Sequence, residues 1–184
     1  MNIRSALKPL AVVAALAAVC VVVLVVLGRD DERGDHDHLG GDGHAHVEGP
    51  TPSGADAGSA AKYGLTAMFS WRPVEDISTG QGLARAKPWL AEPLLGQADA
   101  PPATGIRPIP QWSGWRASAD VVTASVEIDE VGAAEQGERR VTATVTQTVL
   151  HVDGSSTPYS VMHVAAAVVE TPDGWRLSNY RVTG

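Results

Sequence analysis

The sequence contains one cysteine, Cys20, which lies inside a long apolar run near the N-terminus. No intramolecular disulfide can form, so any folded part must be held together by its hydrophobic core. Basic side chains are also scarce, with 14 Lys and Arg against 21 Asp and Glu in 184 residues. Residues 29–184 hold 12 of the basic and all 21 of the acidic side chains. Because phosphate contacts depend on Lys and Arg, we expect no nucleic-acid binding.

Catalytic and cofactor motifs are missing as well. The chain has no Gly-x-Ser-x-Gly turn, no His-Glu-x-x-His helix and no glycine-rich phosphate loop, and no cysteine lies outside the apolar run. We therefore predict a non-enzymatic protein without a cofactor.

The longest apolar run extends from Leu10 to Leu27 and consists of Ala, Val and Leu plus Cys20. As a helix its 18 residues span roughly 27 Å, enough to cross the apolar part of a bilayer. Arg4 and Lys8 precede it and an acidic tract follows. We predict a cytoplasmic N-terminus (1–9), a single-pass transmembrane anchor (10–28) and an extracytoplasmic remainder. A cleaved signal peptide is the main alternative, and a lipoprotein modified at Cys20 is the other.

Residues 29–62 are rich in Gly, Asp, Ser and Pro and poor in large aliphatics, which predicts a flexible acidic linker. Four histidines occur there as two His-x-His pairs: His36, His38, His44 and His46. Imidazoles beside carboxylates are ligands for zinc, copper or nickel, so these four histidines are candidate metal ligands. The alternative is a solvated spacer in which histidine is one polar residue among others.

Residues 63–184 are predicted to form one α+β domain. We expect an extended segment over 63–71, then one or two short helices over 77–95. Asp76 or Ser78 would cap the first helix, and Pro93 would limit the second. An irregular loop is expected between residues 96 and 114.

From Trp115 onward the pattern predicts strands. Val122, Ala124, Val126 and Ile128 alternate with polar residues, and residues 141–149 place Val141, Ala143, Val145 and Val149 opposite a stripe of threonines. Turn signals at residues 153–154 and 172–174 separate further strands over 159–169 and 175–182. The result is a curved four-stranded antiparallel meander preceded by short helices.

Four residues are candidates for a ligand pocket: Trp112, Trp115, His163 and Trp175. Aromatic side chains are common in such pockets, and a mid-strand histidine among small apolar residues is able to line a cavity. Core packing for the tryptophans, and a hydrogen-bonded sheet-face position for the histidine, are the alternatives.

Short helices followed by a curved sheet that ends in DGWRLSNY, residues 173–180, resemble the NTF2-like/cystatin-like superfamily. With the anchor and linker, the chain resembles actinobacterial membrane-anchored proteins of this type, which include Mce-associated and conjugative-transfer accessory proteins. The segments WRPV (71–74) and ARAKPWL (84–90) resemble small proteins of actinobacterial mobile elements. The resemblance implies an accessory or scaffold protein of a cell-envelope assembly with protein partners. The alternative is an extracytoplasmic domain that binds a small ligand or a lipid.

Overall fold

The computed structural model describes residues 50–100 and 109–184. The described elements, in chain order, are α2 (Ala57–Phe69), α3 (Gly80–Arg85), η1 (Lys87–Trp89), α4 (Leu94–Asp99), α5 (Trp112–Ser118), β1 (Val121–Val131), β2 (Glu138–Leu150), β3 (Ser156–Thr171) and β4 (Gly174–Val182). The predicted N-terminus, anchor and linker residues 29–49 lie outside the described residues. In the two described stretches, no helix has the length and apolarity needed to cross a bilayer.

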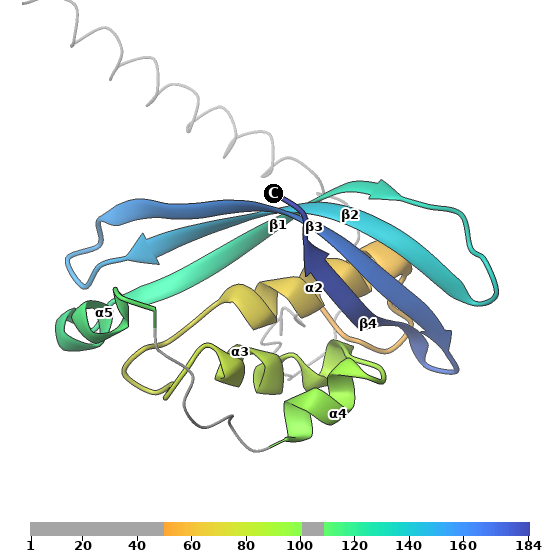
Figure 1. The fold of residues 1–184 in the computed structure, drawn as a ribbon, viewed down its shortest axis with the longest axis horizontal. Helices are drawn as coiled ribbons and strands as arrows, with labels where there is room; N and C mark the ends of the chain where they lie inside the picture. The colour runs from red at the N-terminus through yellow and green to blue at the C-terminus, as the bar shows by residue number, and fades with distance from the viewer. Residues whose placement is uncertain (1–49, 101–108) are drawn as a thin grey trace, which may run out of the picture. The chain divides into compact units, whose positions relative to one another are not determined.

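The strands form an antiparallel meander in the order β1-β2-β3-β4, which confirms the predicted α+β architecture (Figure 1). Along β2, Val141, Ala143 and Val145 are buried, whereas the threonines between them are half-buried on the opposite face. Because strand side chains alternate between faces, the sheet presents its apolar side to the helices. The opposite side, which carries the threonines, is called the outer face below.

Helix α2 lies against the apolar face of the sheet (Figure 1). Asp56 caps it, with its Oδ1 accepting the Ser59 N–H at 2.7 Å. This helix corrects two predictions, the extended segment over 63–71 and the extension of the linker to residue 62. The alanine-rich start of α2 favours a helix, and burial of one helical side against the sheet outweighs the β preference of the aromatic residues that follow.

Three short elements, α3, η1 and α4, follow α2, where one or two short helices were predicted over residues 77–95, and α4 extends to Asp99, into the predicted loop. Their ends differ from the prediction. Thr79, rather than Asp76 or Ser78, occupies the N-cap of α3 and makes no side-chain capping bond, while Asp76 accepts a hydrogen bond from Arg85. Pro93 precedes α4 rather than ending a helix. The segment between η1 and α4 contacts the sheet, with the Ala91 N–H donating to the Leu177 carbonyl at 2.9 Å.

Helix α5 replaces the predicted loop end and the predicted start of the strand region at Trp115. Trp112 and Trp115 are three residues apart, so a helical turn directs both indoles to the same side. Both are buried there, at 5% and 8% exposure. The first strand therefore begins only at Val121.

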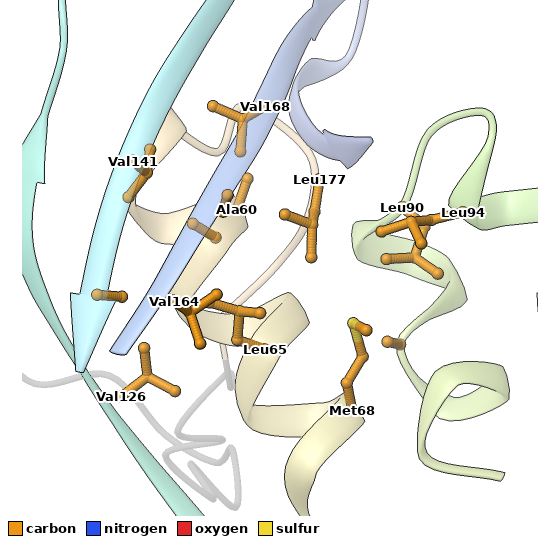
Figure 2. Close-up of a cluster of buried hydrophobic side chains, with 14 of the residues drawn as sticks. Ala60, Leu65, Met68, Leu90, Leu94, Val126, Val141, Val164, Val168 and Leu177 are labelled. Carbon is orange, nitrogen blue, oxygen red and sulfur yellow. The ribbon is translucent and has the colours of Figure 1, made fainter. Parts of the chain in front are cut away.

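The main core lies between α2 and the apolar face of the sheet. Figure 2 shows its side chains converging from α2, from the strands and from the segment around α4: Ala60, Leu65, Met68, Leu90, Leu94, Val126, Val141, Val164, Val168 and Leu177. Leu65 and Leu177 are fully buried, and each such side chain contributes about 1.5–3 kcal/mol to folding.

Candidate functional site

A groove of about 410 Å³ lies between α2, the α3–η1 segment and the start of β1. This α2–β1 groove is lined by Pro50, Tyr63, Thr66, Ala67, Ser70, Trp71, Arg72, Arg85, Trp89, Val121, Val122 and Thr123. Its volume falls within the range of about 300–1,000 Å³ that is typical of binding sites. It is therefore large enough to receive a short stretch of peptide or a small apolar ligand.

Aromatic side chains form the walls of the α2–β1 groove. The rings of Tyr63 and Trp89 have their centroids 5.0 Å apart. Trp71 is buried, and its Nε1–H donates to the Met68 carbonyl at 3.1 Å. Trp112 and Tyr159 support Trp71 at centroid distances of 6.1 and 6.4 Å. These contacts fix the aromatic surface before any ligand binds, which lowers the entropy cost of binding.

The polar part of the groove is set by Arg85. Its Nη2 donates to Asp76 Oδ2 at 2.9 Å and to the Ser70 carbonyl at 2.6 Å. Asp76 is buried and also accepts the Arg72 N–H at 2.7 Å. These bonds hold the turn after α2 against α3, so the groove wall keeps a fixed position.

Arg72 provides a positive charge that is available to a ligand. Its guanidinium lies 3.4 Å from Glu75, and the two side chains are 59% and 68% exposed. A surface pair of this kind contributes only about 0–1 kcal/mol, so a ligand carboxylate is able to replace Glu75. The groove thus combines an apolar aromatic surface with one cationic side chain at its rim.

The structure brings two of the four predicted ligand residues together. Trp112 and Trp115 belong to a buried cluster with Trp71, in which Trp115 makes an edge contact with Tyr159 at 4.8 Å. Neither indole lines the α2–β1 groove. They support its wall from behind through Trp71.

The other two predicted residues lie elsewhere. Trp175 lies near the start of α2, where Arg139 stacks over its ring at 5.2 Å. His163 is exposed on the outer face, with its Nδ1 3.3 Å from Thr144 Oγ1. The sequence did not indicate that Tyr63, Trp71 and Trp89 form one site. It predicted an extended segment over residues 63–71, and an extended segment gives no reason for Tyr63 to lie beside Trp89.

The predicted metal ligands His36, His38, His44 and His46 lie outside the described residues. Within residues 50–100 and 109–184, no group of three or more His, Cys, Asp and Glu side chains is arranged to hold a metal ion.

A second polar array lies where α5 meets β1. His151 Nδ1 is 3.1 Å from Asp120 Oδ1, and His151 Nε2 is 2.8 Å from Thr157 Oγ1. Ser118 Oγ donates to Asp120 Oδ2 at 2.7 Å. Asp120 is buried at 6% exposure. The array joins the start of β1 to both sides of the β2–β3 hairpin.

The hydrogen bond from Ser118 is the main cause that lowers the pKa of Asp120 below its usual value of 3.8, and the bond to His151 adds to it. Asp153, in the β2–β3 turn, likewise has a lowered pKa because Ser155 donates to it. Both carboxylates therefore stay ionised at neutral pH.

No protein-family model and no curated protein sequence matches this chain. Among solved structures, CagV from Helicobacter pylori strain 26695, a VirB8 homolog of the type IV secretion system, is similar over 68% of this chain and 95% of its own, with 12% identity and a TM-score of 0.45. The Agrobacterium tumefaciens VirB8 protein is similar over 67% and 87%, with 9% identity and a TM-score of 0.36. The intermembrane space region of the chloroplast protein ARC6 is similar over 52% and 72%, with 13% identity and a TM-score of 0.31. At these TM-scores the likenesses assign no function to the chain.

Proposed function

We propose that this chain is a single-pass, membrane-anchored and non-enzymatic accessory protein of a cell-envelope assembly, with its C-terminal domain on the extracytoplasmic side. The domain binds a segment of a partner protein in the α2–β1 groove. The assembly is a transfer channel of the conjugative or type IV secretion kind, in line with the sequence resemblance of residues 71–90 and 173–180.

The observation that supports partner binding is the composition of the groove. The half-buried Tyr63 and the largely buried Trp71 and Trp89 line the groove, and burial of apolar ligand side chains against them yields about 25 cal/mol per Å² of apolar surface removed from water. Aromatic residues and arginine are also the residue types that carry most binding energy at protein interfaces. Arg72 and Arg85 supply the arginines of the α2–β1 groove.

The charges select the kind of segment. Arg85 is already neutralised by the buried Asp76, whereas Arg72 is held only by an exposed and weak contact with Glu75. A segment with one or two large apolar side chains next to a carboxylate matches both parts of the groove. The carboxylate would pair with Arg72 while the apolar side chains lie against Tyr63 and Trp89.

A groove-filling variant tests this function. Thr66 is half-buried and lines the groove, so Thr66→Trp would fill it, whereas Lys62→Trp adds an indole at an exposed position one helical turn earlier, outside the residues that line the groove. Full-length wild type and both variants are purified from membranes of the native host, and the envelope proteins that accompany each are compared. We expect Thr66→Trp to lose at least one partner that both Lys62→Trp and wild type retain.

Identical sets of accompanying proteins for all three chains would contradict the proposal. The alternative, a lipid or small ligand, gives a different result. In that case, added lipid raises the melting temperature of wild type and Lys62→Trp but not that of Thr66→Trp, while the partner set stays the same.

A further inference from the structure

The outer face of the sheet is not covered by any helix among the described residues (Figure 1). Its central strands carry mostly small or β-branched side chains, namely the threonines of β2 and, on β3, Val161, Ala165 and Ala167, together with the exposed His163 on β3 and Arg140 on β2. Val161 is 63% exposed. Apart from His163 and Arg140, these side chains form a smooth, weakly polar surface.

The strand register places charges at the two edges of this face. Glu130 is opposite Thr142, Thr142 is opposite Ala165, and Ala165 is opposite Arg181. Directly opposed residues share one side of a sheet, so these four form a row across the outer face. The row begins with a carboxylate on β1 and ends with a guanidinium on β4.

The two charged ends cannot pair with each other within one copy. Three strand spacings separate them, or about 14 Å. Glu130 and Arg181 are both exposed, and neither takes part in the ion pairs found in the described stretches. On the β1 side, Glu127 and Asp129 add further negative charge.

We propose that the outer face binds a second copy of this chain, with the two-fold axis parallel to the strands and passing between β2 and β3. This axis places β1 of one copy over β4 of the other. Glu130 then faces Arg181 of the second copy, and by symmetry the same pair forms twice. Thr142 faces Ala165 of the second copy at the centre, where the small size of both side chains allows the sheets to approach to about 10 Å.

The charge pattern selects this arrangement over the other two-fold arrangement. An axis perpendicular to the strands would place β1 over β1, so the acidic residues Glu127, Asp129 and Glu130 would face one another. Arg140 is exposed one row nearer the β1–β2 hairpin, and its long side chain can keep its charge in solvent.

The area of the outer face determines how strongly two copies are expected to bind each other. Four strands by four rows of outward residues cover on the order of 500 Å² on each copy, because strands lie about 4.8 Å apart and same-side residues about 6.8 Å apart. Two such faces bury on the order of 1,000 Å², which is at the lower end of specific interfaces. We therefore expect a weak dimer whose population depends on concentration.

Charge reversal tests the pairing. Full-length protein in detergent micelles is studied by sedimentation velocity over a wide concentration range, for wild type, Glu130→Lys, Arg181→Glu and the double variant. Each single reversal should raise the dimer Kd by about tenfold, because two attractive pairs become repulsive. The double variant should return the Kd to within about threefold of wild type. Lys62→Glu, a reversal on the exposed side of α2, should have no effect.

A protein that stays monomeric at all concentrations would overturn the inference, as would a dimer that neither single reversal weakens. Failure of the double variant to restore dimerisation would equally refute the Glu130–Arg181 pairing. If Glu130→Lys instead releases a different accompanying protein from a monomeric chain, the outer face binds that protein and not a second copy. These outcomes are independent of the α2–β1 groove, which lies on the helical side of the sheet.

Discussion

Arg85 on α3 forms an ion pair with Asp76, nine residues earlier, and the two side chains are 33% and 4% exposed. The same guanidinium bonds the Ser70 carbonyl at the end of α2. One side chain thus connects the end of α2, the following turn and α3. Since Arg85 lines the α2–β1 groove, this pair also fixes one wall of the proposed binding site.

Removing Arg85 should therefore destabilise the domain. Arg85→Ala leaves the buried Asp76 carboxylate without its cation, and we expect a loss of about 2–4 kcal/mol in the free energy of unfolding. Arg72→Ala removes an exposed pair and should cost less than about 1 kcal/mol. All five tryptophans lie in the described residues, so urea unfolding followed by tryptophan fluorescence measures both values. Equal losses for the two variants would show that the Arg85–Asp76 pair has no special role.

A second prediction concerns Gly82, where α3 approaches the end of α2. A Cβ on Gly82 would lie 2.3 Å from the Met68 carbonyl oxygen, which is too close for any real contact. Gly82→Ala should therefore force the two helices apart and cost about 2–3 kcal/mol or more. Gly114 on α5 has open space around the same position, and Gly114→Ala should be neutral or stabilising by up to about 1 kcal/mol. The same fluorescence measurement compares them, and a neutral Gly82→Ala would contradict the close approach.

Strand positions were predictable because alternation along a strand is a local pattern. The sequence placed β1, the buried valines of β2 and the final hairpin correctly, since one buried face imposes a period of two. Gln147 interrupts the valine series but stays buried at 2% exposure, because its Nε2–H donates to the Phe69 carbonyl at 2.7 Å. That bond joins residues 78 positions apart, and no local pattern predicts it.

The helices and the groove were less predictable, because they depend on contacts between residues far apart in the sequence. Residues 63–69 have β-prone aromatics, yet they become helical because α2 packs along the sheet, which is a tertiary effect. Because Tyr63 lies on helix α2, its ring packs against Trp89 of η1. The groove therefore results from tertiary packing and not from the spacing of residues in the sequence. Asp120 is buried for a similar reason, because His151 reaches it from the β2–β3 hairpin.

The Asp120 array leads to a prediction about pH. The pKa of Asp120 is lowered in the folded state by Ser118 and His151, so its ionised form stabilises the fold above its usual value of 3.8. This stabilisation is lost as the pH falls below 3.8 through the lowered pKa. Asp120→Asn should therefore melt below wild type at pH 6, and the gap should narrow at pH 3. A gap of equal size at both pH values would contradict the assigned role of the carboxylate.

The central claim is that the α2–β1 groove holds a segment of a partner protein, and cross-linking from inside the groove tests it most directly. The photoreactive residue p-benzoylphenylalanine replaces Tyr63 in the full-length chain in its native host, and the exposed neighbour Lys62 serves as the control position. With the photoreactive residue at position 63, illumination should cross-link the chain to one envelope protein. The cross-linked segment of that protein should have apolar residues beside a carboxylate. The same residue at position 62 should give no such cross-link. Adducts at Tyr63 that contain only lipid or a second copy of this chain, or none at all, would contradict the account.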